Sequence, residues 1–352
     1  MNPNIYVWSR RDTGSDIIQC SIVNTHGFEL RVTNYGATIT NIFVPASGGK
    51  KIDVVLGYDT IEEYEKGSCY FGACVGRFGG YIKDGTIQLG NKKYQLELTD
   101  GKNHLHGGLK GFDKRIWNYK TGNGSIIFSR KSPDGEEHYP GNLTVSVRYE
   151  LNEDDVIKIV YDAKTDHDTV LNLTNHSYYN LNGEGSGNIL MHKLMLCSDL
   201  YNVDNSDGIS WVGLCDVTDT PFDFRTFKEI GKDINHECEQ LRFGHGYDHN
   251  MYLGNPGILK KAAELKGDKT GISMAVYTNQ SGIQLYTGNY IQDEPGKNGH
   301  IYHVNEGVCL ETQYCASEKN MDEQYLYPVL KAGDKYHHEC ELHFSYCKKE
   351  EK

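Results

Sequence analysis

The chain has 352 residues, of which 38% are hydrophobic. These residues, which include 25 tyrosines, supply enough apolar and aromatic surface for a large core. Its formal net charge of -12 argues against nucleic acid and anionic membranes as partners, because both require a basic surface. No apolar run approaches the roughly 20 residues of a membrane-spanning helix, and the N-terminal residues lack the apolar run of a secretion signal, so we expect a cytoplasmic protein.

Alternation of apolar and polar residues dominates the chain and predicts antiparallel strands packed on a core. Helical periodicity is confined to two short segments. In chain order, the pattern predicts one or two helical turns at Asp59–Lys66, strands at Gly141–Leu151 and Val156–Ala163, a helical turn at Thr226–Ile230, and strands at Gly271–Thr278, Ile283–Ile291 and Tyr336–Tyr346.

Turn-forming residues separate these segments, and 39 glycines are distributed along the chain. Many short strands joined by such turns are typical of a sandwich or a barrel. The sequence contains no internal repeat, low-complexity tract or linker-like change in composition. We therefore predict an all-β fold, a large antiparallel β-sandwich with few short helices, formed by residues 1–352 as a single domain.

Ten cysteines are present, and none form a Cys-x-x-Cys pair. In a cytosolic chain we expect them to be reduced and mostly to serve as small core residues. Cys69 and Cys74 lie close in sequence, as do Cys309 and Cys315, but a reducing compartment disfavours a disulfide at either pair.

Two histidines are candidate ligand-binding residues. His106 is followed by Gly107 and Gly108, which let the backbone turn sharply and a ligand approach closely. His176 follows a short apolar strand and lies among hydroxyls, amides and aromatic rings such as Tyr178, which are able to fix its tautomer. Taken alone, the first motif also fits a turn with a solvated histidine, and the second a core histidine with satisfied hydrogen bonds.

Two carboxylates and an amide complete the set of candidates. Asp248 lies in a glycine-rich segment that, taken alone, is typical of an Asx turn. Glu311 lies in the apolar strand Val308–Gln313, where a carboxylate is seldom buried without a partner or a purpose. A structural salt bridge is the competing explanation. Gln284 opens a strand-to-turn segment whose amide is a candidate to contact a sugar hydroxyl.

Two histidines and a carboxylate also raise the question of a metal, since such a set binds iron or zinc in other proteins. No His-Glu-x-x-His motif is present, and the chain has neither a Gly-x-x-x-x-Gly-Lys-Ser/Thr loop nor a Gly-x-Ser-x-Gly elbow. We expect no metal and no cofactor.

The candidate motifs, in their order, resemble those of the galactose mutarotase family, also called the aldose 1-epimerases. The resemblance runs through most of the chain and implies the family's fold, a large antiparallel supersandwich with an open cleft for a sugar. Besides the two histidine motifs, it rests on Asn34–Pro45, Asp53–Asp59, Tyr70–Arg77, Thr220–Arg225, Gly246–Asn250, Tyr286–Asn289 and Leu310–Gln313.

The resemblance implies interconversion of the α and β anomers of a free aldohexose, galactose or glucose, without a cofactor. In the family's pattern, Glu311 is the general base that takes the proton from the C1 hydroxyl. His176 is the general acid that protonates the ring oxygen, so that the hemiacetal opens and then closes on the other face. The substrate-binding residues that the resemblance implies are His106, Tyr178, Asp248 and Gln284.

The chain departs from the family where contacts to the sugar are expected. The run Gly79–Ile82 replaces the usual Ala-Asn-Arg-Ile, so an amide and a guanidinium are lost, the latter to Tyr81. A lost hydrogen bond to a charged group costs about 1.5–3 kcal/mol. Arg77 would share a face with Tyr81 in a regular strand, but we do not count on it as a replacement. The loop that supports Glu311 is also changed, to Tyr314–Met321.

Four functions remain open on these residues. The leading hypothesis is an aldose 1-epimerase, and the next is a catalytically weak sugar-binding or regulatory protein on the same fold. A glycoside hydrolase would need two carboxylates, which Asp248 and Glu311 could supply. A sugar-phosphate epimerase is disfavoured by the net charge. We expect a small aldohexose as partner, no nucleic acid or membrane, and a monomer or weak dimer.

Overall fold

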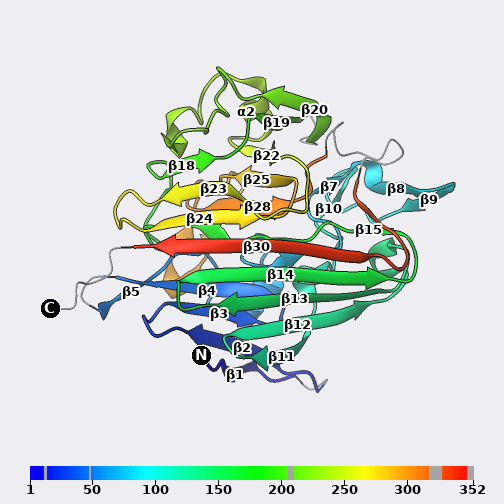
Figure 1. The fold of residues 1–352 in the computed structure, drawn as a ribbon, viewed down its shortest axis with the longest axis horizontal. Helices are drawn as coiled ribbons and strands as arrows, with labels where there is room; N and C mark the ends of the chain where they lie inside the picture. Colours follow the sequence, from blue (N-terminus) through cyan, green and yellow to red (C-terminus); the bar gives the residue numbers. More distant parts are fainter. Residues whose placement is uncertain (12–13, 47–48, 205–209, 317–326, 347–352) are drawn as a thin grey trace.

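The computed structural model describes residues 1–11, 14–46, 49–204, 210–316 and 327–346. Residues 317–321 of the changed loop after Glu311 lie outside these ranges. Most of the regular structure is β-strand, assembled into three large antiparallel sheets and several two-stranded ones (Figure 1).

The largest sheet has nine strands in the order β11-β12-β13-β14-β30-β24-β23-β18-β21. The C-terminal strand β30 lies between β14 and β24 near the middle of this sheet (Figure 1). The strands are β11 (Asn118–Gly122), β12 (Ser125–Ser132), β13 (Leu143–Leu151), β14 (Val156–Thr165), β18 (Lys193–Leu196), β21 (Lys228–Glu229), β23 (Lys260–Lys266), β24 (Ser273–Thr278) and β30 (Lys335–Ser345).

The second sheet has six strands in the order β17-β28-β25-β22-β19-β20, and the third has five in the order β1 to β5. The six strands are β17 (Tyr178–Tyr179), β19 (Leu200–Asp204), β20 (Ser210–Asp216), β22 (Asp248–Tyr252), β25 (Gly282–Tyr286) and β28 (Val308–Gln313). The five are β1 (Asn4–Ser9), β2 (Ile17–Val23), β3 (Glu29–Thr33), β4 (Thr38–Pro45) and β5 (Lys51–Asp53).

Two-stranded sheets, short helices and 3-10 turns accompany the large sheets. The paired strands are β6 (Cys74–Val75) with β16 (Thr174–Asn175), β7 (Tyr81–Ile82) with β10 (His104–Leu105), β8 (Thr86–Leu89) with β9 (Lys92–Gln95), β15 (Thr169–Val170) with β29 (Val329–Leu330), and β26 (Glu294–Pro295) with β27 (Ile301–Tyr302). The helices are α1 (Ile61–Lys66) and α2 (Glu239–Phe243), with 3-10 turns at Lys83–Gly85, Phe112–Lys114, Glu136–His138, Ile230–Lys232 and Lys297–Gly299.

One hydrophobic core joins the three large sheets. It contains Val32 of β3, Val147 of β13 and Leu285 of β25, all fully buried. Along β13, buried residues alternate with more exposed ones, as the period-two pattern predicted. Because each sheet turns an apolar face toward the same core, the predicted antiparallel β-sandwich is confirmed.

The segments predicted in chain order are largely confirmed. The predicted strands at 141–151, 156–163, 271–278 and 336–346 correspond to β13, β14, β24 and β30 within two residues at each end. Helix α1 is also confirmed, and a capping box explains where it starts. The Thr60 side chain accepts from the backbone N–H of Glu63, whose carboxylate accepts from the N–H of Thr60.

Two of these predictions need correction. Strand β25 ends at Tyr286 rather than at Ile291, and Gly288 beyond it takes a φ of 67°, which a regular strand does not allow. The helical turn predicted at Thr226–Ile230 is wrong. Lys228–Glu229 instead pairs with β18 at the end of the nine-stranded sheet, and a 3-10 turn starts only at Ile230.

No helix within the described ranges has the length and hydrophobicity that a membrane span requires. The nine cysteines of the described residues are all free thiols, including both pairs that lie close in sequence.

Candidate active site

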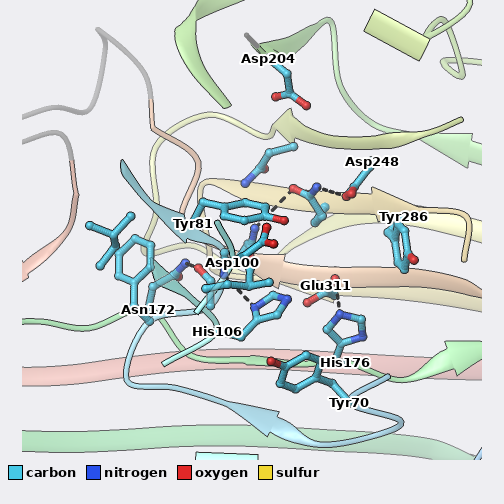
Figure 2. A pocket seen from close by; sticks show the side chains of 18 of the residues that line it. Tyr70, Tyr81, Asp100, His106, Asn172, His176, Asp204, Asp248, Tyr286 and Glu311 are labelled. Carbon is cyan, nitrogen blue, oxygen red and sulfur yellow. Dashed lines mark hydrogen bonds and ion pairs between the residues drawn. The ribbon is translucent and has the colours of Figure 1, made fainter. Parts of the chain in front are cut away.

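A cavity of about 970 Å³ opens over one face of the six-stranded sheet, and Figure 2 shows many of the side chains that line it. Strands β17, β28, β25, β22 and β19 contribute residues to it, as do segments around β7 and β10. It brings together all six residues that the sequence singled out, although they lie far apart along the chain. These residues are His106, His176, Tyr178, Asp248, Gln284 and Glu311.

Strand register explains how the sheet assembles this face. Gln284 in β25 lies directly opposite Glu311 in β28 and, on its other side, opposite Asn250 in β22. Residues that are opposite in neighbouring strands share a face, and so do residues two apart in one strand. Asp248, two residues before Asn250, is therefore on the same face as Gln284 and Glu311.

His176 follows β16 directly, and the backbone fixes its position. Its N–H donates to the carbonyl of Ala73 and its carbonyl accepts from the N–H of Gly72, both at 3.0 Å. The side chain is only 5% exposed, and Nε2 lies 3.6 Å from Oε1 of Glu311. Burial lowers the pKa of His176 to about 4. His176 is thus more than a core histidine with satisfied bonds, because one ring nitrogen faces a carboxyl group at the cavity.

Glu311 is equally buried, with 4% of its side chain exposed. Among the described residues the ionisable group beside its carboxyl oxygen is His176, and no lysine or arginine forms the structural salt bridge that the sequence left open. Burial, together with the nearby Asp248 carboxylate, raises the pKa of Glu311 well above its usual range. A carboxyl group with a raised pKa exchanges protons more readily near neutral pH, which suits acid–base chemistry.

His106 is held by its backbone and by one ring nitrogen. It takes a φ of 50°, and the next residue, Gly107, takes a φ of 89°. A Cβ on Gly107 would lie 1.8 Å from the carbonyl oxygen of Gly76, so only glycine fits there. The Nδ1 atom of His106 accepts a hydrogen bond from the N–H of Gly80 at 3.1 Å. Nε2 therefore carries the proton of the neutral ring and is the donor left for a ligand.

Asp248 and Gln284 form a hydrogen-bonded pair in the cavity. Nε2 of Gln284 donates to Oδ1 of Asp248 at 2.8 Å (Figure 2). Asp248 is part of strand β22, and its carboxylate bonds across to β25, so the interpretation of an Asx turn is wrong. Burial raises the pKa of Asp248 to about 6. The carboxylate is therefore ionised at neutral pH and ready to accept from hydroxyl groups.

Tyr81 occupies the position where an arginine was expected, and it lines the cavity. Its hydroxyl lies near the carboxylate of Asp100, which, together with burial, raises the pKa of Tyr81 (Figure 2). Arg77 does not replace the lost guanidinium. It is 1% exposed, and its N–H groups are bonded away from the cavity. The acceptors, at 2.9–3.0 Å, are Ser132 Oγ and the carbonyl oxygens of Ser132, Pro133, Pro140 and Gly141.

We expect Arg77 to stabilise the fold. Arg77→Met keeps much of the side-chain volume but leaves several buried carbonyl groups without a donor, so the free energy of unfolding should fall by at least about 3 kcal/mol. Chemical denaturation monitored by circular dichroism measures this change. The matched control is Arg148→Met, which removes a half-exposed guanidinium paired with Glu150 and should cost about 1 kcal/mol or less. Equal losses in the two variants would contradict the assignment.

The sequence did not single out several residues that line the cavity. Tyr286 lies two residues after Gln284, and Asn250 two after Asp248, so strict alternation from a known site residue would have found both. Tyr70 and Asp100 lie in loops, where no periodicity places a side chain. The cavity-lining residues that were not predicted as site residues include Tyr70, Asp100, Asn172, Asp204, Asn250, Tyr286, Tyr290 and Gln313.

His176, Cys309 and Glu311 are the one group of described residues with a spacing that suits a metal, because their ligand atoms lie within 4.8 Å of one another. The donor set fits a metal poorly. A metal requires a thiolate and a carboxylate, whereas burial raises the pKa of Cys309 and of Glu311 well above their usual ranges. The two nitrogens of His176 also face different partners. His104, close to His106 in sequence, bonds instead to the Tyr139 hydroxyl.

Comparison with known proteins supplies an independent finding. The family model for aldose 1-epimerases matches residues 19–343. The chain is 36% identical over 340 residues to the galactose mutarotase of Mus musculus, covering 96% of this chain and 97% of the relative. It is 39% identical over 316 residues to that of Bos taurus, with 89% and 90% covered. The aldose 1-epimerase of Escherichia coli K12 is 33% identical over 317 residues, with 89% and 91% covered.

Solved structures agree with this result. An aldose epimerase homologue from C. elegans superposes with a TM-score of 0.83 at 29% identity, covering 93% of this chain and 98% of the other. A galactose 1-epimerase from Lactobacillus acidophilus superposes with a TM-score of 0.84 at 28% identity, covering 98% of both. The likeness therefore extends over almost the whole sandwich.

Proposed function

The chain belongs to the aldose 1-epimerase family, and from this premise we infer that it is an isomerase that interconverts the α and β anomers of free aldoses. The observation that carries the assignment is the adjacent buried pair His176 and Glu311 at an open cavity. Anomer exchange needs an acid and a base that act on two oxygens of one carbon, with no redox step. Two groups 3.6 Å apart are able to reach both oxygens.

The proposed substrate is a free aldohexose, galactose or glucose. Amides, carboxylates, imidazoles and tyrosine rings line the cavity, and this mixture suits a ring with polar edges and apolar faces. The mammalian relatives are named galactose mutarotases, which supports galactose as the first sugar to test. A pure binding protein would need no acid–base pair, and family membership favours the epimerase over a glycoside hydrolase or a sugar-phosphate epimerase.

In the proposed mechanism, Glu311 takes the proton from the C1 hydroxyl while His176 gives one to the ring oxygen. The hemiacetal bond between C1 and the ring oxygen breaks, and the C1–C2 bond rotates. The ring then closes on the other face with the two roles reversed, so each group regains its starting proton state. Each positioned acid or base contributes roughly 10²–10⁴ in rate.

The pKa shifts of the pair favour the state that the reaction reaches midway and disfavour the charged pair from which it starts. Midway through the reaction, Glu311 is protonated and His176 is neutral, and burial favours both of these uncharged forms. The starting ion pair and the midway neutral pair differ only in the position of one proton. The low polarity of the site therefore offsets part of the cost of opening the ring.

The remaining candidates would bind the sugar. His106 would donate from Nε2 to a hydroxyl, and Asp248 would accept from one while Gln284 orients its carboxylate. Tyr178 would close the pocket behind His176, against which its ring stacks at 5.1 Å between centroids. These side chains alone supply the chemistry, so the proposed reaction calls for no cofactor.

We expect the binding contribution of Asp248 to depend on pH. Its raised pKa of about 6 means that the carboxylate form, which accepts hydroxyl hydrogens, is lost as pH falls through that value. KM for the sugar should therefore rise below about pH 6. Asp248→Asn should raise KM roughly 10- to 150-fold at neutral pH and abolish this pH dependence.

Steady-state anomer exchange measured from pH 4.5 to 8 tests this expectation. The matched control is Asp100→Asn, another carboxyl group of the cavity, in an exposed position. This control should keep the dependence near pH 6. A KM that varies with pH in the same way in the Asp248→Asn variant would assign the effect to another group.

Residues 1–352 would form a single domain that acts in the cytoplasm as a monomer or weak dimer, with the aldose as its partner and neither nucleic acid nor membrane. Limited proteolysis and sedimentation would test the domain and the oligomeric state.

Saturation-transfer NMR on equilibrated galactose and glucose, with catalytic amounts of protein, tests the function directly. Exchange between the two C1 protons well above the buffer rate would support the proposal and rank the two sugars. If folded protein leaves both sugars at the buffer rate, these two substrates are excluded and a binding role on the same fold becomes the better hypothesis.

A further inference from the structure

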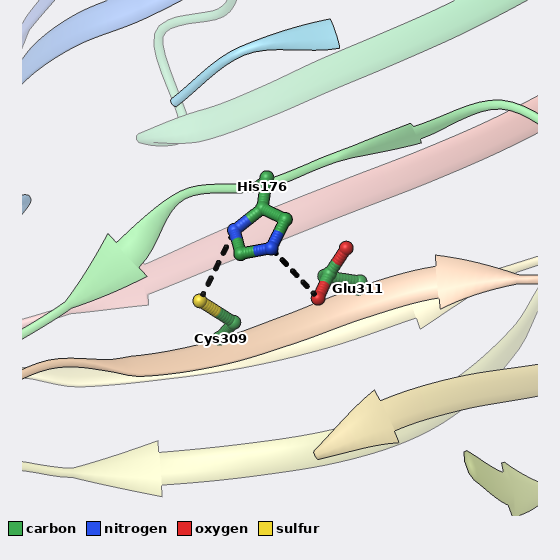
Figure 3. A group of neighbouring side chains, drawn as sticks. All are labelled: His176, Cys309 and Glu311. Atoms are coloured by element: carbon green, nitrogen blue, oxygen red, sulfur yellow. Dashed lines mark hydrogen bonds and ion pairs between the residues drawn. The ribbon is translucent and has the colours of Figure 1, made fainter. Parts of the chain in front are cut away.

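Cys309 contacts His176 on the side away from Glu311. Its sulfur lies 3.5 Å from Nδ1 of the imidazole, while Nε2 lies 3.6 Å from the Glu311 carboxyl group (Figure 3). Cys309 is fully buried and stands two residues before Glu311 in β28, so one strand presents both partners to the two edges of one ring.

Aromatic contacts hold the ring in this orientation. The rings of Tyr70 and Tyr178 stack against His176 with interplanar angles of 27° and 30°. Tyr178 is itself paired with Cys309 across β17 and β28. The stacking fixes the plane of the ring, and the contacts of Nδ1 with Cys309 and of Nε2 with Glu311 fix which edge faces each partner. A half-turn about the Cβ–Cγ bond would keep the plane but place ring carbons at both polar contacts.

The proposed reaction sets a condition on Nδ1. His176 must carry a proton on Nε2 when it acts as the acid and a lone pair on Nε2 afterwards. Nδ1 keeps its hydrogen in both states, since a ring without any N–H would be an anion. That hydrogen therefore needs an acceptor throughout the reaction, and the Cys309 sulfur is the atom placed to accept it.

We propose that Cys309 is a positioning residue for His176: its sulfur accepts the Nδ1–H, which reserves Nε2 for proton exchange with the sugar. This inference rests on the proposed function and extends it to a residue that does not touch the substrate. The thiol is suited to the role because sulfur accepts hydrogen bonds only weakly. A carboxylate in its place would stabilise the imidazolium and hold the proton on the histidine.

The chemistry of the surroundings fits this role. Burial raises the pKa of the Cys309 thiol well above its usual range, so the sulfur stays neutral and does not form an ion pair with the imidazolium. The other titratable groups that face His176 come from several elements. They are Tyr70, His106, Tyr178, Tyr286 and Glu311.

The test compares Cys309→Ala, Cys309→Ser and a matched control, Cys20→Ala, which removes a buried thiol from β2 in a different sheet. Nitrogen-15 NMR of the sugar-free protein reports the tautomer of His176, and its loss in His176→Gln assigns the signal. Saturation transfer across pH 4–9 reports kcat and KM for each variant.

In Cys309→Ala we expect the Nδ1–H tautomer to lose its excess over the Nε2–H tautomer. We also expect kcat to fall about 3- to 10-fold at unchanged KM, the effect of one neutral hydrogen bond. In Cys309→Ser the hydroxyl is the better acceptor, so the tautomer and most of kcat should be kept while the acid limb of the pH profile moves to higher pH. Cys20→Ala should match the wild type.

A His176 tautomer ratio and kcat unchanged in folded Cys309→Ala would overturn the inference, as would an equal fall of kcat in Cys20→Ala. Because the tautomer is read without sugar, it decides the role of Cys309 even if the wild type fails to exchange the anomers. That second failure would overturn the proposed function instead.

Discussion

Glu311→Gln should lower kcat for anomer exchange by about 10²–10⁴ while the protein stays folded. The amide keeps the shape of the carboxyl group but neither takes the C1 hydroxyl proton nor returns it. KM should change much less, because the proposed contacts of His106 and Asp248 with the sugar remain. The raised pKa of Glu311 means that the native carboxyl already favours its neutral form, so a neutral amide adds little strain at this buried position.

Saturation transfer on galactose measures this loss, and denaturation confirms that the variant is folded. Glu150→Gln is the matched control, since it removes a carboxylate that pairs with Arg148 on the surface of β13. It should leave exchange unchanged. Wild-type exchange in a folded Glu311→Gln variant would remove Glu311 from the role of base and turn attention to Asp248, the cavity carboxyl group that Gln284 hydrogen-bonds.

The sequence predicts the fold well where strands are more exposed on one face than on the other. In β13 and β30 the apolar side chains recur at every second position, so the pattern reports both the strand and its buried face. Short segments carry less information. The segment Thr226–Ile230 has spacing that a helical turn tolerates, yet its middle residues pair with β18, and that pairing is a property of the sheet rather than of the segment.

The candidate site is predictable only in part. The six residues singled out do meet at one cavity. The distances between those on the sheet follow from strand register, which places Gln284 opposite Glu311. Neither segment alone determines that register. Arg77 shows the opposite case. A regular strand would have allowed it to face the sugar, a contact on which we did not count, and its guanidinium instead satisfies carbonyl groups of a distant turn.

The contact of Cys309 with His176 could not be predicted from the sequence. In the sequence it is one apolar residue in a buried strand, and its contact with Nδ1 of His176 depends on a partner 133 residues away. Alternation places it on the same face as Glu311, but only the position of the histidine ring brings the sulfur to Nδ1 and supports the acceptor role that we propose for it.

His176→Gln should reduce kcat by a factor similar to that of Glu311→Gln, roughly 10²–10⁴. The ring oxygen is a poor leaving group without a proton, and the glutamine amide has none of suitable acidity to give. Tyr70 and Tyr178 stack against the native imidazole, so the loss of ring contacts should also lower stability by about 1 kcal/mol. Exchange kinetics on galactose and denaturation separate the two effects.

The double variant His176→Gln/Glu311→Gln distinguishes a coupled pair from two independent groups. If the two side chains exchange protons with one sugar in a single step, removing either already disables that step, and the second substitution should cost little more. The double variant should then be about as slow as the slower single variant. A loss near the product of the two single losses would mean that each group acts on its own, and the 3.6 Å approach of Nε2 to Oε1 would then be incidental to catalysis.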